Sequence, residues 1–249
     1  MILSKMTWKE VDAISRDTVV LFATGSCEQH GGHLPLFTDS ILATAVAESV
    51  AQKLSDDTLL APTFWLGASG HHLPFAGTIS SPDEAYINQM VNAIEGFIRH
   101  GFWKFYIING HGGNQSVNDL ALRRIKMKFP QVQCGHSGYY SYAAEAASKV
   151  LEGPSKTIMH SCEAEVSLML HVSPQLVRED LLVDDGYKSS ALGMVYNFDE
   201  ITDNGSLGYA TLATAEKGKT IFDAAVDGLV KAITWLRHDG TLEQLPPKS

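Results

Sequence analysis

The sequence has few cysteines, no long uncharged apolar run and no local cluster of basic residues. Its three cysteines, Cys27, Cys134 and Cys162, are odd in number and far apart, which argues against a secreted disulfide framework and indicates free thiols. No stretch of about 18 uncharged apolar residues occurs, and the N-terminus lacks a basic start followed by an apolar segment. We therefore expect a soluble cytoplasmic protein with no membrane partner.

Positive charge is also scarce. With 19 Lys and Arg against 28 Asp and Glu, the formal net charge is −9, which disfavours a nucleic-acid partner because phosphate contacts need Lys and Arg. The 249 residues are 45% hydrophobic and can bury one large core. No repeat, low-complexity linker or shift in composition marks a boundary, so we expect residues 1–249 to form a single domain.

Strand and helix patterns alternate along much of the chain. β-branched and aromatic runs predict strands at 18–24, 58–66 and 102–108, and a shorter one near Val132. Periodic apolar positions predict helices over about 41–54, 82–99, 116–129 and 220–237, an Ala-rich helix after an aromatic loop at 139–142, and a helix beginning near Ser161. Such alternation predicts a three-layer α/β/α sandwich with a mostly parallel central sheet.

Side chains that bind metals follow two of the predicted strands. Glu28, His30 and Asp39 come after the first of them, and His111 comes after the strand that ends near residue 108. In an open α/β sheet the loops at the carboxyl ends of the strands converge on one crevice, so these side chains can meet there. Carboxylates and imidazoles suit Zn, Mn or Fe, and one carboxylate can bridge two ions about 3.5–4 Å apart.

These residues also have ordinary structural interpretations. Asp39 alone is typical of a helix cap, and Gly110, Gly112 and Gly113 alone are typical of a tight turn. Together, however, the segments would crowd partly buried charge at one edge of a sheet, which is unfavourable unless a cation compensates it. We therefore favour a metal site.

Two cysteines leave a cysteine hydrolase as an alternative. Cys27 and Cys162 adjoin the candidate site, but Glu28 and Glu163 beside them would raise the pKa of each thiol, whereas a nucleophilic cysteine needs an electropositive setting. We expect neither thiol to act as a nucleophile. The tyrosines of the aromatic loop at 139–142 leave two interpretations open, because they either line a pocket or pack within the loop.

Five segments carry a resemblance to a known family. Residues 28–39 resemble the Glu-x-His-Gly-x-His-Leu-Pro-x-x-Thr-Asp signature of the creatininase (creatinine amidohydrolase) family, and residues 109–114, Asn-Gly-His-Gly-Gly-Asn, match its second signature. Residues 67–78, 160–167 and 213–218 are similar to three further segments of the family, in the same order. The chain is therefore identified as a member of this family.

The resemblance implies a role for each matched side chain. Glu28 would bind the first metal ion, His30 the second, Asp39 would bridge them, and His111 would complete the first site. Where creatininase has a glutamate ligand for the second ion, this chain has Gly113. Glu165 is the expected replacement, and a water ligand with a weak second site is the alternative.

Further residues are implied around the two ions. His160 would be the proton shuttle, in a loop before a helix that carries Glu165 one turn in, because the two residues would otherwise lie on different helix faces. His33 would orient a metal ligand. His72, Ser69 and Tyr139 are the candidates for substrate contact.

The implied activity is metal-dependent hydrolysis of a C–N bond in a small amide or cyclic amide by a metal-bridged hydroxide. The family also includes deformylases, a peptidase acting on a peptide cofactor precursor, and hydrolases of cyclic ketones, and these activities stay open. So do a non-catalytic metal-binding protein and a catalytically silent subunit. Creatinine is not the expected substrate, because no lid tryptophans lie between Gly135 and His160 and because Met159 replaces a family glutamate. A homo-oligomer is implied, commonly a hexamer.

Overall fold

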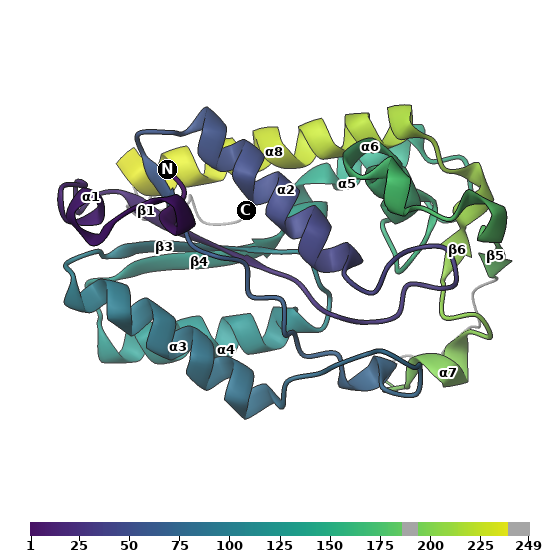
Figure 1. The fold of residues 1–249 in the computed structure, drawn as a ribbon, viewed down its shortest axis with the longest axis horizontal. Coiled ribbons are helices and arrows are strands. Elements are labelled where there is room, and N and C mark those ends of the chain that lie inside the picture. The colour runs from purple at the N-terminus through teal and green to yellow at the C-terminus, as the bar shows by residue number, and fades with distance from the viewer. Residues whose placement is uncertain (186–193, 239–249) are drawn as a thin grey trace, which may run out of the picture.

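The computed structural model describes residues 1–185 and 194–238 and contains a central parallel sheet (Figure 1). Its strand order is β2-β1-β3-β4, and every pair of neighbours is parallel. The strands of this sheet are β1 (Val19–Thr24), β2 (Thr58–Leu60), β3 (Lys104–Asn109) and β4 (Gln133–Gly138). A separate antiparallel pair joins β5 (Asp184–Asp185) to β6 (Gly208–Tyr209).

Helices cover both faces of the sheet, which confirms the predicted three-layer arrangement (Figure 1). The helices over one face are α2 (Thr38–Lys53), α5 (Tyr139–Val150), α6 (Glu163–Val172) and α8 (Ala215–His238). The helices over the other face are α3 (Asp83–Arg99) and α4 (Asn114–Lys128). Two short helices, α1 (Trp8–Asp12) and α7 (Phe198–Ile201), lie outside these layers. In the described part of the chain, no helix combines the length and apolar character needed to cross a membrane.

Strand β1 explains why the sheet is covered on both sides. Successive side chains of a strand point to opposite faces, and every residue of β1 is buried. Leu21 and Ala23 pack in the core with α2 and α8, whereas Val20 and Phe22 pack in the core with α3 and α4. A strand that is apolar on both faces is typical of a parallel sheet, and it leaves only the strand ends free to carry polar function.

The carboxyl ends of β1 and β3 lie side by side. Thr24 and Asn109, the last residues of the two strands, are paired in register. The Thr24 hydroxyl donates to Asn109 Oδ1 at 3.0 Å, and Asn109 Nδ2 donates to the carbonyl of His111 at 2.6 Å. The loop after β3 is therefore tied to the end of β1, and the two predicted metal-binding segments begin at the same edge of the sheet.

Several element boundaries differ from the sequence predictions. The second strand ends at Leu60, and the extended chain beyond it keeps only an isolated bridge from Phe64 to Thr24. The predicted aromatic loop at 139–142 is wrong, because Tyr139 begins α5 directly after β4. The predicted start of the last helix at 220 is five residues late, because α8 begins at Ala215.

The start of α6 is held by a buried ion pair. Glu163 accepts hydrogen bonds from the backbone N–H groups of Glu152 and Gly153, at 2.9 Å each, and from Lys217 Nζ at 2.7 Å. Burial opposes ionisation of this carboxyl, but these donors outweigh it and lower the pKa of Glu163. Lys217 lies in the first turn of α8, so the pair connects that helix to α6 and to the preceding loop.

We expect Lys217→Met to lower the free energy of unfolding by roughly 2–4 kcal/mol at neutral pH, because it leaves the Glu163 carboxylate buried without its cation. A carboxyl whose pKa is lowered in the folded state stabilises the protein above its ordinary pKa of 4.5, and this contribution is lost as the pH falls through the lower folded value. The difference from wild type should therefore shrink in acid. Urea unfolding at neutral pH and near pH 3 measures both effects.

Lys219→Met is the matched control for this measurement. Lys219 pairs with Asp223 on the surface of the same helix, with both side chains more than half exposed. An exposed pair contributes at most about 1 kcal/mol, so this variant should unfold nearly as wild type does. Equal losses from the two substitutions would contradict a special role for the buried pair.

Candidate functional site

Three predicted ligands meet beyond the ends of β1 and β3. His111 Nδ1 lies 3.2 Å from Glu28 Oε2 and 3.0 Å from Asp39 Oδ2. Glu28, Asp39 and His111 are all buried, and one ligand atom from each lies within 4.8 Å of the others, so they form a group able to hold a metal ion. The three come from the loop after β1, the first turn of α2 and the loop after β3.

Asp39 also reaches a second set of side chains. Its other carboxylate oxygen lies 3.0 Å from His30 Nε2, and the same nitrogen lies 3.7 Å from Glu165 Oε2. Ser26 Oγ donates to Asp39 at 2.9 Å. The alternative that Asp39 caps a helix is wrong, because α2 begins at Thr38 and its N-cap residue makes no side-chain cap hydrogen bond. Asp39 instead touches a histidine on each side.

His160 lies between the two groups, in the loop before α6 as predicted. Its Nδ1 is 3.6 Å from Glu28 Oε1, and its Nε2 donates to the backbone carbonyl of Gln29 at 2.8 Å. Burial and the neighbouring His30 lower the pKa of His160, so the ring is neutral. The geometry also places His160 in two groups able to hold a metal, one with Glu28 and His72 and one with His30 and Glu165.

The loop that carries His160 has a strained backbone residue. Ser161 has φ of 52°, in the left-handed region that non-glycine residues rarely adopt. Its hydroxyl donates to the carbonyl of His30 at 2.7 Å and lies 3.0 Å from His33 Nε2. Its backbone N–H donates to Glu165 Oε2. His33 therefore contacts the turn at Ser161 and not the side chain of a predicted ligand.

The candidates for substrate contact lie in different places. Ser69 is fully buried, and its hydroxyl lies 3.3 Å from His111 Nε2, so it supports a predicted ligand and does not line the cavity. His72 does line the cavity, and its Nε2 lies 3.3 Å from Glu28 Oε1. Tyr139 is fully buried with its hydroxyl unpartnered, and the tyrosine that reaches the cavity is Tyr140.

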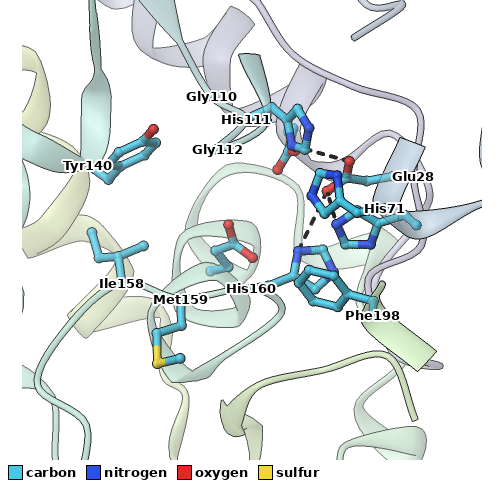
Figure 2. Close-up of a pocket in the computed structure, with 14 residues that line it drawn as sticks. Glu28, His71, Gly110, His111, Gly112, Tyr140, Ile158, Met159, His160 and Phe198 are labelled. Carbon is cyan, nitrogen blue, oxygen red and sulfur yellow. Dashed lines mark ion pairs between the residues drawn. The ribbon is translucent and has the colours of Figure 1, made fainter. Parts of the chain in front are cut away.

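The side chains surround a cavity of about 320 Å3. Figure 2 shows Tyr140, Ile158 and Met159 across the cavity from the side where Glu28 and His71 lie. Sequence patterns alone did not indicate that His71, Ile158 and Phe198 line the cavity, and Met159 stood out only because it replaces a family glutamate. His71 had a signal, since it neighbours His72, whereas Phe198 comes from α7 and its ring stacks on His72 at a centroid distance of 3.8 Å without any local motif to indicate it.

Three buried carboxyl groups gather at the site, and only histidines are available to compensate their charge. Glu28, Asp39 and Glu165 all line the cavity, and no Lys or Arg of the described residues does so. Burial lowers the pKa of His30, but Asp39 and Glu165 outweigh burial and raise it to about 9. Burial raises the pKa of Glu165 to about 8. Without a metal, protons therefore supply the positive charge that the cluster requires, and a bound cation would displace them.

Glu28 gives the sharpest indication of a missing partner. Both of its carboxylate oxygens are buried without a well-formed hydrogen bond, and the nearest polar atoms are histidine ring nitrogens at 3.2–3.6 Å. A buried carboxylate without such partners is rare because its desolvation is not compensated. Since Asp39 and His111 supply further oxygen and nitrogen donors beside it, the chemistry of this set suits Zn, Mn or Fe. The residues therefore fit the metal ions that the family resemblance implies.

Gly113 has no room for the glutamate that creatininase carries at this position. A Cβ at Gly113 would collide with the carbonyl of Ala68 and with the ring of His111. The loop after β3 thus follows a path that only glycine permits, and it keeps His111 against that backbone. Glu165, on α6, is the second carboxylate near His30, beside Asp39.

Neither cysteine near the site has the setting of a nucleophile. Burial, with a contribution from Glu165, raises the pKa of the Cys162 thiol to about 11. Burial also raises the pKa of Cys27. Neither residue lines the cavity. The expectation that neither thiol acts as a nucleophile agrees with these positions, although burial raises the pKa of each thiol more than the nearby acidic residues do.

Comparison with known proteins gives a consistent set of relatives. A family profile described as "Creatininase: Creatinine amidohydrolase" matches residues 4–233. 3-dehydro-scyllo-inosose hydrolase of Thermotoga maritima is 28% identical, with 97% of this chain and 85% of that protein covered. Mycofactocin precursor peptide peptidase of Mycobacterium ulcerans is 33% identical, with 86% of this chain and 84% of that protein covered.

Solved structures agree with the sequence comparison. A mutant creatininase of the Zn-Zn type and a creatininase with Mn each superimpose with a TM-score of 0.82 at 28% identity, covering 93% of this chain and 96% of the other. The fold, the order of the signatures and the profile match therefore all agree. The chain belongs to the creatininase family of amidohydrolases.

Proposed function

We propose that this protein hydrolyses a C–N bond of a small amide or cyclic amide with the help of two divalent metal ions. The observation that carries the proposal is the Glu28 carboxylate, which is buried without a well-formed hydrogen bond and lies beside Asp39 and His111. Family membership supports the reaction class. Zn and Mn are candidates because related creatininase structures are described with them, and Fe suits the same donors.

The chain offers ligands for two ions. Glu28, Asp39 and His111 would hold the first, and His30 with Glu165 would hold the second, with Asp39 shared between them. Such a pair of ions polarises a carbonyl oxygen and makes water a nucleophile near neutral pH. The remaining catalytic work, which is to bind the substrate and to move a proton, belongs to the protein's own side chains.

His160 is positioned for proton transfer. Because the carbonyl of Gln29 can only accept, the hydrogen bond at 2.8 Å places a proton on His160 Nε2 and leaves a lone pair on Nδ1. Nδ1 is the nitrogen that faces Glu28, 3.6 Å from its carboxylate. We propose that Nδ1 accepts a proton from the attacking water and then delivers it to the departing nitrogen.

The cavity favours a small substrate without a phosphate group. Among the described residues that line it there is no Lys or Arg, so a phosphoryl group would find only histidines as positive partners. Tyr140, Ile158 and Met159 offer an apolar wall that suits a ring or an aliphatic side chain. A peptide amide is the second candidate substrate, because the 33% identical relative from Mycobacterium ulcerans is a peptidase.

The direct test compares metal-loaded and chelator-treated protein. We expect the loaded protein to hydrolyse at least one member of a panel of small cyclic amides, N-formyl amines and short peptides, and we expect treatment with a chelator to abolish that activity reversibly. Released amine or ammonia is the measured product. Activity that survives complete removal of metal would contradict the proposed mechanism.

Glu165→Gln is expected to lower the metal content from about two ions per chain to about one, because Glu165 belongs only to the set around His30. Glu165 takes the place of the glutamate that Gly113 cannot carry. Elemental analysis of protein purified without chelator measures the ratio. An unchanged ratio would mean that Glu165 does not hold the second ion.

We further propose that the whole chain forms one hydrolase domain and assembles as a homo-oligomer, commonly a hexamer in this family. The family profile supports a single unit because it matches residues 4–233 without interruption. The three cysteines are free thiols, which fits the cytoplasmic location that we propose. Size-exclusion chromatography with light scattering measures the number of subunits.

A further inference from the structure

Gln29 lies between two predicted ligands in the chain, and its side-chain amide contacts three separate segments. Its Oε1 accepts from the backbone N–H of Gly31 at 2.9 Å, and its Nε2 donates to the carbonyl of Gly205 at 2.8 Å. Nε2 also lies 2.9 Å from His72 Nδ1. Because a backbone N–H only donates and a carbonyl only accepts, these two backbone groups determine which way the amide faces.

The orientation of the amide determines the tautomer of His72. Since Gln29 Nε2 is a donor, His72 Nδ1 must accept, and the ring proton therefore sits on Nε2. That nitrogen lies 3.3 Å from Glu28 Oε1 and donates toward it. Gln29 thus holds His72 as a donor to the one ligand that otherwise lacks hydrogen-bond partners.

Gln29 acts on His160 as well, through its backbone. The carbonyl of Gln29 accepts the proton on His160 Nε2. The side-chain nitrogen of Gln29 lies 3.1 Å from the same ring atom, but this contact is no hydrogen bond because both nitrogens are donors. His72 and His160 are therefore both oriented by Gln29, and both face Glu28.

The segment around Gly205 is shaped to admit this amide. Gly205 has φ of +84°, and a Cβ there would collide with Gln29 Oε1. Two residues further on, the backbone N–H of Leu207 donates to the carbonyl of His160 at 2.9 Å. The amide of Gln29 therefore holds Gly205, and the neighbouring backbone at Leu207 holds the loop that carries the proposed proton shuttle.

We propose that Gln29 is a positioning residue whose side-chain amide holds His72 in the Nε2-protonated tautomer, orients Glu28 for metal binding, and closes the segment at Gly205 onto the site. This inference rests on the proposed metal-dependent hydrolase function. Gln29 touches no reacting atom in this arrangement, and it acts through the side chains of His72 and Glu28.

Two substitutions of Gln29 separate its shape from its hydrogen bonds. Gln29→Met keeps a side chain of similar length without polar atoms, and Gln29→Glu places an acceptor where His72 now meets a donor. Nitrogen-15 NMR of the histidine rings in metal-free protein reports the tautomer. We expect wild type to show His72 protonated on Nε2, and we expect Gln29→Glu to move that proton to Nδ1 or to add a second one.

Zinc affinity gives a second measurement that does not depend on turnover. We expect both variants to bind Zn²⁺ roughly 10–100-fold more weakly in competition with a chromophoric chelator, because His72 would no longer be held as an outer partner of the ligand Glu28. Where turnover can be followed, kcat should fall more than KM rises. Gln52→Met, an exposed position on α2, is the matched control and should behave as wild type.

Each outcome decides the proposal. Unchanged His72 tautomer and Zn²⁺ affinity in both variants would overturn it. If Gln29→Met fails to fold, Gln29→Asn replaces it, because its side chain is one methylene shorter and its amide cannot reach His72. We expect the same loss of Zn²⁺ affinity from that variant. If wild type hydrolyses no amide while the Gln29 variants still change the tautomer and weaken Zn²⁺ binding, the proposed function fails and the positioning role stands.

Discussion

Asp39→Asn is expected to remove nearly all bound metal and to lower kcat/KM by well over 100-fold. Loss of a residue that only hydrogen-bonds to a metal ligand lowers activity by up to roughly 100-fold, and loss of a shared ligand should cost more. The reason is geometric, because one carboxylate oxygen of Asp39 contacts His30 and the other contacts His111, each at 3.0 Å. An amide keeps the shape of the side chain and its contact with Ser26, but it removes the charge and one acceptor. Elemental analysis and steady-state kinetics measure the two effects.

Thermal unfolding provides an independent check of the Asp39 prediction. A ligand that binds only the folded state raises its stability, so wild type should unfold at a higher temperature with Zn²⁺ or Mn²⁺ present, and Asp39→Asn should not respond. Asp83→Asn, an exposed position in α3, is the control for charge removal. Full metal content in Asp39→Asn would show that Asp39 is no ligand.

His160→Ala is expected to lower kcat by about 10²–10⁴-fold while the protein keeps its metal, which is the range for loss of a general acid or base. The ring Nδ1 faces Glu28, and Nε2 donates to the carbonyl of Gln29, so the ring is oriented toward the proposed site of reaction. In the arrangement that we propose, His160 is not a metal ligand. Metal content and kcat are measured on the same preparation.

The opposite result for His160 would also be informative. His160 belongs to two groups able to hold an ion, with Glu28 and His72 or with His30 and Glu165. Loss of metal together with loss of activity would therefore identify His160 as a ligand and remove the proton shuttle from the mechanism. His100→Ala, an exposed histidine after α3, is the control and should change neither quantity.

The fold was predictable from local patterns, with errors where local signals compete. The fully apolar run of β1 and the periodic face of α3 predicted a covered parallel sheet, and the structure confirms it. The aromatic segment beginning at Tyr139 was assigned to a loop, but Gly138 ends β4 directly before it and the chain continues as α5. Tyrosine has no strong helical preference, so packing of α5 against α8 decided the outcome.

The candidate site was predictable in its residue types and less so in its contacts. Glu28, His30, Asp39 and His111 follow strand ends, where polar side chains of a parallel sheet must gather, and the structure brings them together. The substrate contacts were harder to place. Ser69 contacts the side of the His111 ring at Nε2, whereas His71 and His72 of the same loop are the residues that line the cavity.

The sequence alone therefore determined the chemistry available to this protein: the carboxylates and imidazoles, their order along the chain, and the strands that deliver them to one edge of a sheet. Those properties depend on residue type and on periods of a few residues, which are local. Only the tertiary structure decided that Gln29 orients His72 and that the Phe198 ring stacks on His72 beside the cavity, and it gave the expected Glu165 its contact with His30. Such contacts join segments more than 40 residues apart in the sequence. They depend on strand register and helix packing, which local patterns do not reveal.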